Sequence, residues 1–244
     1  MILQLHQRCP SSARLQDECA ARAYQNPWNR ALLNLLDHDT PGSVLDCGCG
    51  SGDNGRVLAA MGYKVTGVTI SPSEQAIAQR FCHSVIIHDL DEGLPSKLDG
   101  PFNVVILSHV LEHLRQPCRL LADIKRVIAS DGLLLVALPN TLHFRHRFEF
   151  LFGRFEYRAC GIMDATHLHF YTYESGRRLL ELNGFHVVRC AAEGAFPLPV
   201  IRRALPNVAG FADRLACKLL PGLFASQLLY VTHADENTSW GKIL

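Results

Sequence analysis

The sequence predicts a doubly wound α/β fold, in which seven mostly parallel strands form one sheet with helices on both faces. Short runs rich in β-branched residues alternate with stretches of helical periodicity along most of the chain, which is typical of parallel α/β proteins. The interiors of these runs are apolar, as expected for strands whose two faces are both covered by helices. The length of 244 residues suits one such domain, or one domain with a small subdomain.

Three strands and two helices are predicted to alternate in the first half of the chain. Residues 1–40 form a lead-in, whose segment 27–37 has helical periodicity. Pro72 stands where the second helix begins, because proline is favoured in the first turn, whose N–H groups lack partners within the helix. The expected strands cover 43–47, 64–70 and 84–87, and the expected helices cover 54–61 and 73–81.

The second half continues this pattern and adds two less regular segments. Pro139 ends an apolar strand, and Gly184 stops a helix because glycine adopts backbone conformations that other residues disfavour. We interpret 1–244 as a single domain with insertions at 140–172 and at 194–223, before the last strand. The expected strands cover 103–108, 132–138, 185–191 and 227–232, and the expected helices cover 117–129 and 174–183.

Both insertions have the composition of segments at a surface. Residues 143–157 are rich in aromatic and basic side chains. This fits either a lid over a polar head group or, as we favour, the apolar core beneath a covering helix. The segment 194–223 contains an amphipathic stretch with basic residues, which is compatible with peripheral membrane contact. For that stretch we favour packing against the domain or a dimer contact.

Charge and composition exclude several classes of protein. The 24 Lys and Arg residues nearly balance the 23 Asp and Glu residues, so the chain lacks the cationic surface that binds nucleic acid. The longest uncharged apolar stretch, about 16 residues over 219–234, is shorter than the roughly 20 that span a bilayer. The nine cysteines are scattered without a CxxC pair, and no secretory signal opens the chain. We therefore expect reduced thiols and a cytoplasmic protein.

The strongest motif lies at the end of the first strand, where Val44 to Gly52 reads VLDCGCGSG. Gly48, Gly50 and Gly52 let the backbone turn tightly and approach a ligand where a Cβ atom would collide. Asp46 lies at the carboxyl end of the strand, where open α/β sheets bind ligands. A carboxylate at this position would repel a pyrophosphate and attract an ammonium group.

Two other interpretations of this loop stay open. Gly50, Gly52 and Gly55 match the spacing of a dinucleotide fingerprint, which would favour NAD. An acid should then follow about 20 residues later, at the end of the next strand, but residues 65–71 contain none. The NAD interpretation is therefore the weaker one, as is a glycine turn that binds no ligand.

This motif resembles the first motif of class I S-adenosylmethionine-dependent methyltransferases. Further segments match that family in order, so the similarity covers about residues 26–190: GVTISPSEQAIA, HDLDEGLP, FNVVILSHVLEHL, LLADIKRVIASDGLLLVALPN and LLELNGF. The segment GRFEYRACGIMDATHLHFYT resembles the branch associated with bacterial polysaccharide and lipid biosynthesis. The chain is also similar to quinone and methionine-related small-molecule methyltransferases. The resemblance implies a Rossmann-like sheet and S-adenosylmethionine as cofactor.

The resemblance also implies which residues hold the cofactor. Asp46 and the loop would bind the amine and carboxylate of the methionyl group, and Thr69 and Ile70 would contact the ribose and adenine. The family usually has an acid in place of Thr69, whereas threonine makes one uncharged bond, so Ser71 or Gln75 would share the task. The variant GVTIS is also similar to the cyclopropane fatty-acid synthases. The other implied contacts come from Gly48, Cys49, Gly50 and Gly52 in the loop, from Asp89 and Leu90 toward the adenine amino group, and from Leu107 and Ser108 beside the sulfonium.

Methyl transfer to a hydroxyl benefits from a base, and histidine suits this role because its pKa lies near neutrality. His109, just beyond a strand end, is one candidate. His109 and His113 flank Glu112 with i, i+4 spacing, a set that also fits a metal ion. A third ligand is not evident, so we predict no metal site and assign His113 a packing role.

The other candidate base lies in Asp164-Ala165-Thr166-His167, which in the resembled branch reads D-x-T-H-L-R-F and would lie over the methyl group of the cofactor. Asp164 would orient His167, and His167 would be either a base or a structural residue. His169 replaces the usual arginine of that branch, which removes a fixed positive charge for anion recognition.

We therefore expect an S-adenosylmethionine-dependent methyltransferase whose acceptor is a small molecule, a hydroxyl of a glycan or lipid-linked precursor, with 140–172 as the substrate-side lid. The alternatives are carbon methylation of a lipid or quinone, a non-catalytic nucleoside-binding module, and an NAD-dependent oxidoreductase. No nucleic-acid partner is expected. The fold by itself carries no information on the acceptor.

Overall fold

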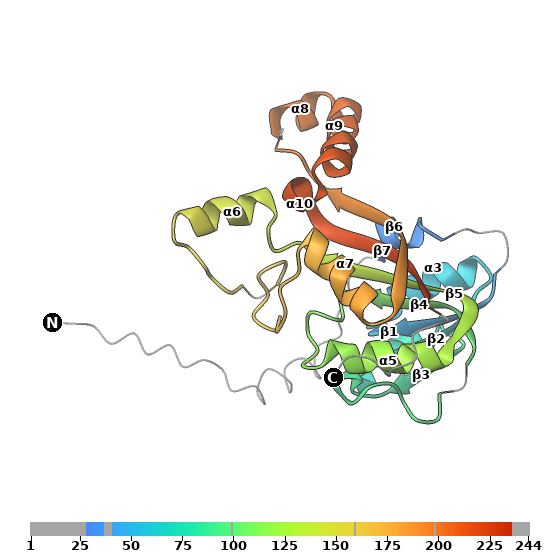
Figure 1. Ribbon diagram of the computed structural model, residues 1–244. Coiled ribbons are helices and arrows are strands. Elements are labelled where there is room, and N and C mark those ends of the chain that lie inside the picture. The colour runs from blue at the N-terminus through green and yellow to red at the C-terminus, as the bar shows by residue number, and fades with distance from the viewer. Residues whose placement is uncertain (1–27, 37–40, 99, 159, 198, 236–244) are drawn as a thin grey trace.

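The computed structural model describes residues 28–235 apart from 37–40, 99, 159 and 198, and it contains a seven-stranded sheet (Figure 1). The strands are β1 Ser43–Cys47, β2 Lys64–Thr69, β3 Ser84–Ile87, β4 Phe102–Ser108, β5 Ile128–Pro139, β6 Phe185–Gly194 and β7 Ala225–Ala234. Their order is β3-β2-β1-β4-β5-β7-β6. Strand β7 is antiparallel to its neighbours β5 and β6, and the other pairs are parallel. The predicted doubly wound, mostly parallel sheet is confirmed.

Helices cover both faces of this sheet. They are α2 Arg30–Leu33, α3 Asp53–Ala60, α4 Pro72–Ala78, α5 Pro117–Val127, α6 Phe144–Leu151, α7 Tyr173–Leu182, α8 Pro199–Ala204, α9 Pro206–Leu219 and α10 Pro221–Phe224, with a 3-10 turn, η1, at Leu90–Glu92. None of these helices is long and apolar enough to cross a membrane. The helix predicted over 27–37 is the short α2, and part of that range lies outside the described residues.

Strand β4 shows how the sequence pattern builds two cores. Side chains of a strand alternate between the two faces of the sheet. Val104 and Ile106 belong to the core that includes residues of α3 and α4, whereas Val105 and Leu107 belong to the core that includes residues of α5 and α7. Because both sets are buried, the strand has to be apolar at successive positions.

Local signals set where the helices begin, and one boundary differs from the prediction. The Ser71 side chain accepts a hydrogen bond from the Glu74 N–H at 3.4 Å, and Pro72 occupies the first turn of α4. These contacts satisfy donors that have no partner inside the helix. Helix α5 ends at Val127, because Ile128 already has an extended backbone and begins β5. The helix predicted to reach residue 129 is therefore shorter, and β5 is longer.

The parallel register brings several loops to one edge of the sheet. Asp46 of β1 pairs with Gly67 of β2 on one side and with Ile106 of β4 on the other. The chain therefore leaves all three strands at the same level. The glycine loop after β1 and the turn at 109–113 after β4 become neighbours, and the candidate site lies there.

The two insertions project from the sheet as α6 and as the α8–α9 pair (Figure 1). In and after α6, Phe148, Leu151 and Phe152 are 61 %, 75 % and 74 % exposed, and His146 is the buried residue of the helix. The favoured core role for this aromatic segment is thus wrong, because most of its rings are exposed and Phe144 and Phe150 are only half-buried. Helix α9 is amphipathic as predicted, since it buries Ala209 and Cys217 on one face.

Candidate functional site

The glycine loop after β1 adopts a backbone that favours glycine. Gly48, Gly50 and Gly52 have φ angles of 72°, 52° and 82°, in the left-handed region that other residues rarely adopt. The N–H groups of Gly48 and Cys49 both donate to the Val68 carbonyl oxygen, at 2.8 and 2.9 Å, which ties the loop to β2. The Cys49 side chain is buried, and burial together with the charge of Asp46 raises its pKa. The backbone N–H groups of Gly48 and Cys49, which were expected to hold the cofactor, are therefore bonded to β2, and the Cys49 thiol is packed in the core.

The loop is also closely packed on both sides. A Cβ atom on Gly48 would lie 2.7 Å from Val110 Cγ2, in the turn after β4, and one on Gly52 would lie 2.9 Å from the Cα atom of Ala78 at the end of α4. Real Cβ atoms essentially never approach so closely. The glycines are therefore required by the fold as well as available for a ligand.

Asp46 carries a buried carboxylate. The residue is 1 % exposed, and neither side-chain oxygen has a hydrogen-bond partner. Burial raises its pKa to about 7, and the nearby Asn54 side chain lowers it in part. We expected the carboxylate to face an open edge, but neighbouring atoms cover it. The Asn54 amide is a nearby donor that lowers this pKa, and it offsets the cost of burial only in part. An ammonium group is a partner that would satisfy the remaining lone pairs.

Asn29, just before α2, lies at the same edge of the sheet and contacts three elements there. Its backbone N–H donates to Asn54 Oδ1 at 2.9 Å, and its side-chain amide donates to Ser108 Oγ at 3.1 Å and to Gln227 Oε1 at 3.0 Å. These bonds connect the beginning of α3 with the end of β4 and the beginning of β7. Sequence reasoning treated this segment only as a lead-in, because a single asparagine gives no signal of such contacts.

At the end of β2 the structure supplies an acid that the sequence motif lacks. Thr69 Oγ1 donates to Glu74 Oε2 of α4 at 2.5 Å, and both residues are buried. Gln75, one of two residues expected to assist Thr69, instead donates to the Val85 carbonyl at 2.9 Å and so supports β3. Ile70 is 50 % exposed next to this pair. The Glu74 carboxylate thus lies beside Thr69, the position at which the family usually has an acid.

Several other predicted cofactor contacts have structural roles. Asp89 Oδ1 accepts a hydrogen bond from the Asp91 N–H at 2.9 Å and caps η1. Leu90 and Leu107 belong to the core on the side of α5. Ser108, at the end of β4, accepts a hydrogen bond from the Asn29 side-chain amide. Of these four predicted residues, only Asp89 and Ser108 present polar atoms near the edge.

His109 is held by two acceptor groups. Its backbone has a φ angle of 57°, unusual for a residue other than glycine. Its Nδ1 lies 3.2 Å from Glu112 Oε1, and its Nε2 lies 3.1 Å from Gln227 Oε1. Burial lowers its pKa, but the hydrogen bonds and the charge of Glu112 outweigh burial and raise the pKa overall. Because both ring nitrogens face acceptor oxygens, these contacts favour the doubly protonated ring, which has no lone pair. The base role of His109 stays a prediction that these contacts do not favour.

The predicted pairing of Asp164 with His167 is not formed. Asp164 Oδ1 instead accepts from the Thr166 N–H at 2.8 Å and from Thr166 Oγ1 at 2.7 Å. His167 Nδ1 donates to the Ile162 carbonyl oxygen at 3.0 Å, because a carbonyl can only accept. Burial and the neighbouring His113 ring lower the pKa of His167. The ring is therefore neutral near pH 7, with a lone pair on Nε2.

The two predicted groups of histidines meet in space. The Glu112 carbonyl oxygen accepts hydrogen bonds from the N–H groups of Leu168 and His169, at 2.8 and 3.1 Å. These bonds hold the segment that contains His167 against the turn after β4. As a result, the His113 and His167 rings approach with centroids 4.7 Å apart. The sequence placed them in separate candidates because 53 residues lie between them.

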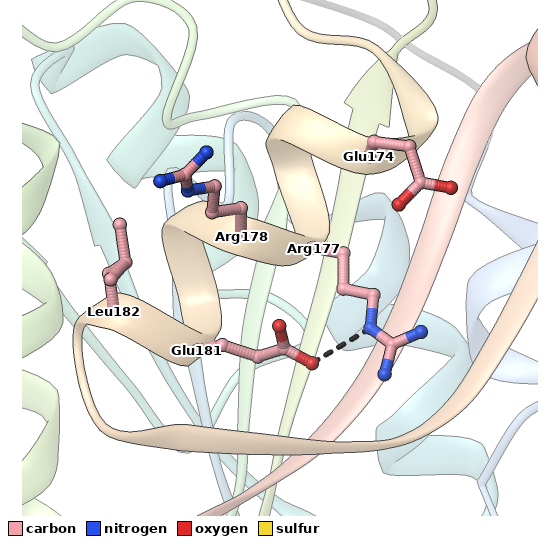
Figure 2. A pocket seen from close by; sticks show the side chains of 5 residues that line it. All are labelled: Glu174, Arg177, Arg178, Glu181 and Leu182. Carbon is pink, nitrogen blue, oxygen red and sulfur yellow. Dashed lines mark hydrogen bonds and ion pairs between the residues drawn. The ribbon is translucent and has the colours of Figure 1, made fainter.

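A surface hollow elsewhere is formed by side chains of α7 (Figure 2). Arg177 Nε and Glu181 Oε1 form an ion pair there at 2.7 Å. The lining residues all come from this one helix, so the hollow is not an enclosed site.

The sheet order, with its antiparallel β7 between β5 and β6, and the glycine loop after β1 define the class I S-adenosylmethionine-dependent methyltransferase fold. A family model described as a methyltransferase domain matches residues 20–189, and the chain belongs to this family. A solved S-adenosylmethionine-dependent methyltransferase from Archaeoglobus fulgidus has the same fold, with a TM-score of 0.59 and 21 % identity over 89 % of this chain and 94 % of that one.

Curated relatives include enzymes of quinone biosynthesis. The demethylmenaquinone methyltransferase of Tropheryma whipplei is 32 % identical over 111 residues, which cover 45 % of this chain and 46 % of that protein. The ubiquinone biosynthesis O-methyltransferase of Maricaulis maris is 31 % identical over 40 % of each chain. The chain thus spans less than half the length of these relatives. The expected polysaccharide and lipid branch stays a prediction.

Proposed function

We propose that this protein transfers a methyl group from S-adenosylmethionine to a hydroxyl of a small-molecule acceptor, and that the acceptor is a quinone-like ring compound. The observation that carries the proposal is the glycine loop after β1, which lies beside the unpartnered Asp46 carboxylate in a chain of the methyltransferase domain family. NAD fits less well, because the Asp46 carboxylate would repel a pyrophosphate.

The residues at the edge suit S-adenosylmethionine, which supplies an electrophilic methyl group when bound. The Asp46 oxygens have no hydrogen-bond partner within bonding distance, and a methionyl ammonium group would provide donors beyond the nearby Asn54 amide. The Thr69 and Glu74 side chains form a buried pair that would accept the ribose hydroxyls, and Ile70 offers apolar surface to the adenine. Because Asp46 is covered, we expect the lead-in around Asn29 to move when the cofactor enters.

On the acceptor side, we propose His167 as the residue that meets the reacting hydroxyl. Its Nδ1 is committed to the Ile162 carbonyl, so its Nε2 can accept the hydroxyl proton while the new oxygen–methyl bond forms. Asp164 positions Thr166 and is not a catalytic residue in this proposal.

The relatives favour a quinone-like acceptor over the glycan or lipid-linked precursor that we expected from sequence. One is named as an O-methyltransferase of ubiquinone biosynthesis, and another as a 2-methyl-6-phytyl-1,4-hydroquinone methyltransferase, from Synechocystis. Transfer to ring carbon is the second candidate, because the motif GVTIS is similar to that of cyclopropane fatty-acid synthases.

Calorimetry with S-adenosylmethionine and with NAD tests the cofactor. We expect binding of the former alone, and binding of NAD alone would overturn the proposal. Incubation with an isotopically labelled methyl donor, hydroquinones, glycans and lipid-linked sugars then tests the acceptor by mass spectrometry. A labelled O-methyl hydroquinone supports the proposal, whereas label on another acceptor class or on ring carbon refutes the acceptor assignment.

A lipid-soluble acceptor would be met at a membrane, and α9 has a suitable surface. Val208, Phe211, Leu215 and Leu219 are exposed and recur at helical spacing along one side of this helix. Arg214 and Lys218 follow two of these residues by three positions, so they flank the apolar stripe. We propose that this stripe rests on an anionic bilayer surface.

Vesicle sedimentation tests this contact. We expect the protein to bind vesicles of anionic lipid more tightly than neutral ones, and the double substitution Phe211→Ser with Leu215→Ser to weaken binding at least about tenfold, because apolar area is lost. Leu182→Ser on α7 is the matched control, since Leu182 is similarly exposed. Equal binding by both variants would refute the contact. A dimer in solution that the double substitution dissociates would identify a dimer interface instead.

A further inference from the structure

Glu112, His113 and His167 form a cluster with the composition of a metal site. One ligand atom from each residue, a carboxylate oxygen or a ring nitrogen, lies within 4.8 Å of the others. Ligand atoms around a tetrahedral zinc ion are roughly 3.4 Å apart, so a small closure would complete such a site. His113 is exposed and can make that adjustment, while Glu112 and His167 are buried.

The hydrogen bonds around the cluster leave both rings ready to bind a cation. Thr166 Oγ1 gives its one hydrogen to Asp164 Oδ1 at 2.7 Å, so it accepts from His113 Nδ1 at 3.0 Å. His167 Nδ1 donates to the Ile162 carbonyl. Each ring therefore carries its proton on Nδ1 and presents a lone pair on Nε2. Metal-binding histidines are usually oriented by such a bond from the opposite nitrogen.

The carboxylate supplies a second, independent observation. Glu112 is fully buried, and its Oε2 atom has no hydrogen-bond partner. The other oxygen, Oε1, is bonded to His109 at 3.2 Å. The cluster thus offers a cation three ligand groups, a buried carboxylate with one unpartnered oxygen and two imidazoles whose Nε2 atoms carry lone pairs.

We propose that Glu112, His113 and His167 bind one divalent transition-metal ion, of the zinc, cobalt or iron(II) class that two histidines and one carboxylate suit. The sequence argued against a metal only because a third ligand was missing, and His167 supplies it from a segment distant in sequence.

Three protein ligands leave coordination positions for a further oxygen ligand. A cation there would bind the acceptor hydroxyl and lower its pKa, so that the hydroxyl proton would pass to solvent. His167 would then be a metal ligand, and the proton-accepting role proposed above for its Nε2 belongs to the metal-free protein. This role in the reaction rests on the proposed function, whereas metal binding itself does not.

Titration of the full-length, chelator-treated protein with Co²⁺ tests the site, because bound cobalt gives visible absorption bands and binding can be followed without activity. We expect one equivalent to bind with a micromolar dissociation constant. His113→Ala and His167→Ala should each weaken binding at least tenfold. His113 is exposed, so its replacement should leave the fold intact. His146→Ala is the control, because His146 also lies beside a carboxylate, at Glu149, but outside the cluster.

Thr166 offers a finer test of the bonds that orient the rings. Thr166→Val removes the hydroxyl that accepts from His113 and should weaken Co²⁺ binding about tenfold, whereas Thr166→Ser should retain it. The absence of saturable binding, or equal affinity in the wild type, His113→Ala and His167→Ala, would overturn the proposal. Calorimetry with S-adenosylmethionine on the same samples separates the metal site from the proposed function. If the protein binds cobalt but not S-adenosylmethionine, only the proposed function is contradicted.

Discussion

Replacing Asp46 by asparagine is expected to weaken S-adenosylmethionine binding at least about tenfold while making the ligand-free protein more stable at pH 8. The loss of affinity follows because the ammonium group loses a charged acceptor. The gain in stability follows because burial of the wild-type carboxylate outweighs the stabilisation that the Asn54 side chain gives it. A rise in pKa from 3.8 to about 7 corresponds to a penalty of at most about 4 kcal/mol at high pH.

The effect of the Asp46 carboxylate on the free energy of unfolding depends on pH. Between about pH 4 and 7 the folded state holds the Asp46 proton more tightly than the unfolded state does. The contribution of protonated Asp46 to the free energy of unfolding is therefore fully present below about pH 4. It is lost as the pH rises through 7. Urea unfolding of the wild type and of Asp46→Asn across this range should therefore diverge toward high pH. The exposed Asp131→Asn is the control. Unchanged cofactor affinity in Asp46→Asn would remove this residue from the site.

Replacing Gly52 by alanine is expected to destabilise the protein by about 2–5 kcal/mol and to abolish measurable binding of the cofactor. Gly52 has a φ angle of 82°, which costs an alanine about 1–2 kcal/mol. The new Cβ would also lie 2.9 Å from the backbone of Ala78, and such an overlap adds about 1–3 kcal/mol. Relief of the overlap would move the loop away from α4.

Gly153→Ala separates the two contributions. Gly153 also has a positive φ, of 69°, but nothing lies within 4 Å of a Cβ atom there. This variant should lose only the backbone contribution and keep full affinity for S-adenosylmethionine. Denaturant unfolding and calorimetry on both variants provide the comparison. If the two lose the same stability, close packing of the glycine loop is not what makes Gly52 necessary.

The architecture was predictable because its signals are local. Apolar residues at successive positions, as in Val104 to Leu107, indicate a strand covered on both faces, and the structure places alternate members in two cores. Ser71 and Pro72 mark the beginning of α4, and the positions of Gly48, Gly50 and Gly52 mark the turn after β1. The boundary at Ile128 was missed because strand pairing with β4 outweighed the helical pattern.

The chemistry at the edge was only partly predictable. Asp46 was found from its motif, but its burial depends on side chains that come from several loops. Glu74 was not considered, because the family motif places its acid at the end of the strand, at Thr69. Glu74 lies five residues further on, in α4, and its contact with Thr69 is visible only in the structure. The hydrogen bonding of Asp164 to Thr166 rather than to His167 could not be inferred from a four-residue motif.

By itself, the sequence determined the order of the seven strands along the chain, the helices α3, α4, α5 and α7 between them, the glycine loop and the family, since each depends on residues close together along the chain. Only the tertiary structure decided that His113 and His167 lie together beside the buried Glu112 and that both nitrogens of His109 face acceptors. It also decided that most of the aromatic rings in and after α6 are exposed. These features arise from contacts between segments tens of residues apart. The packing of the sheet edge creates such contacts, and no spacing along the chain encodes them.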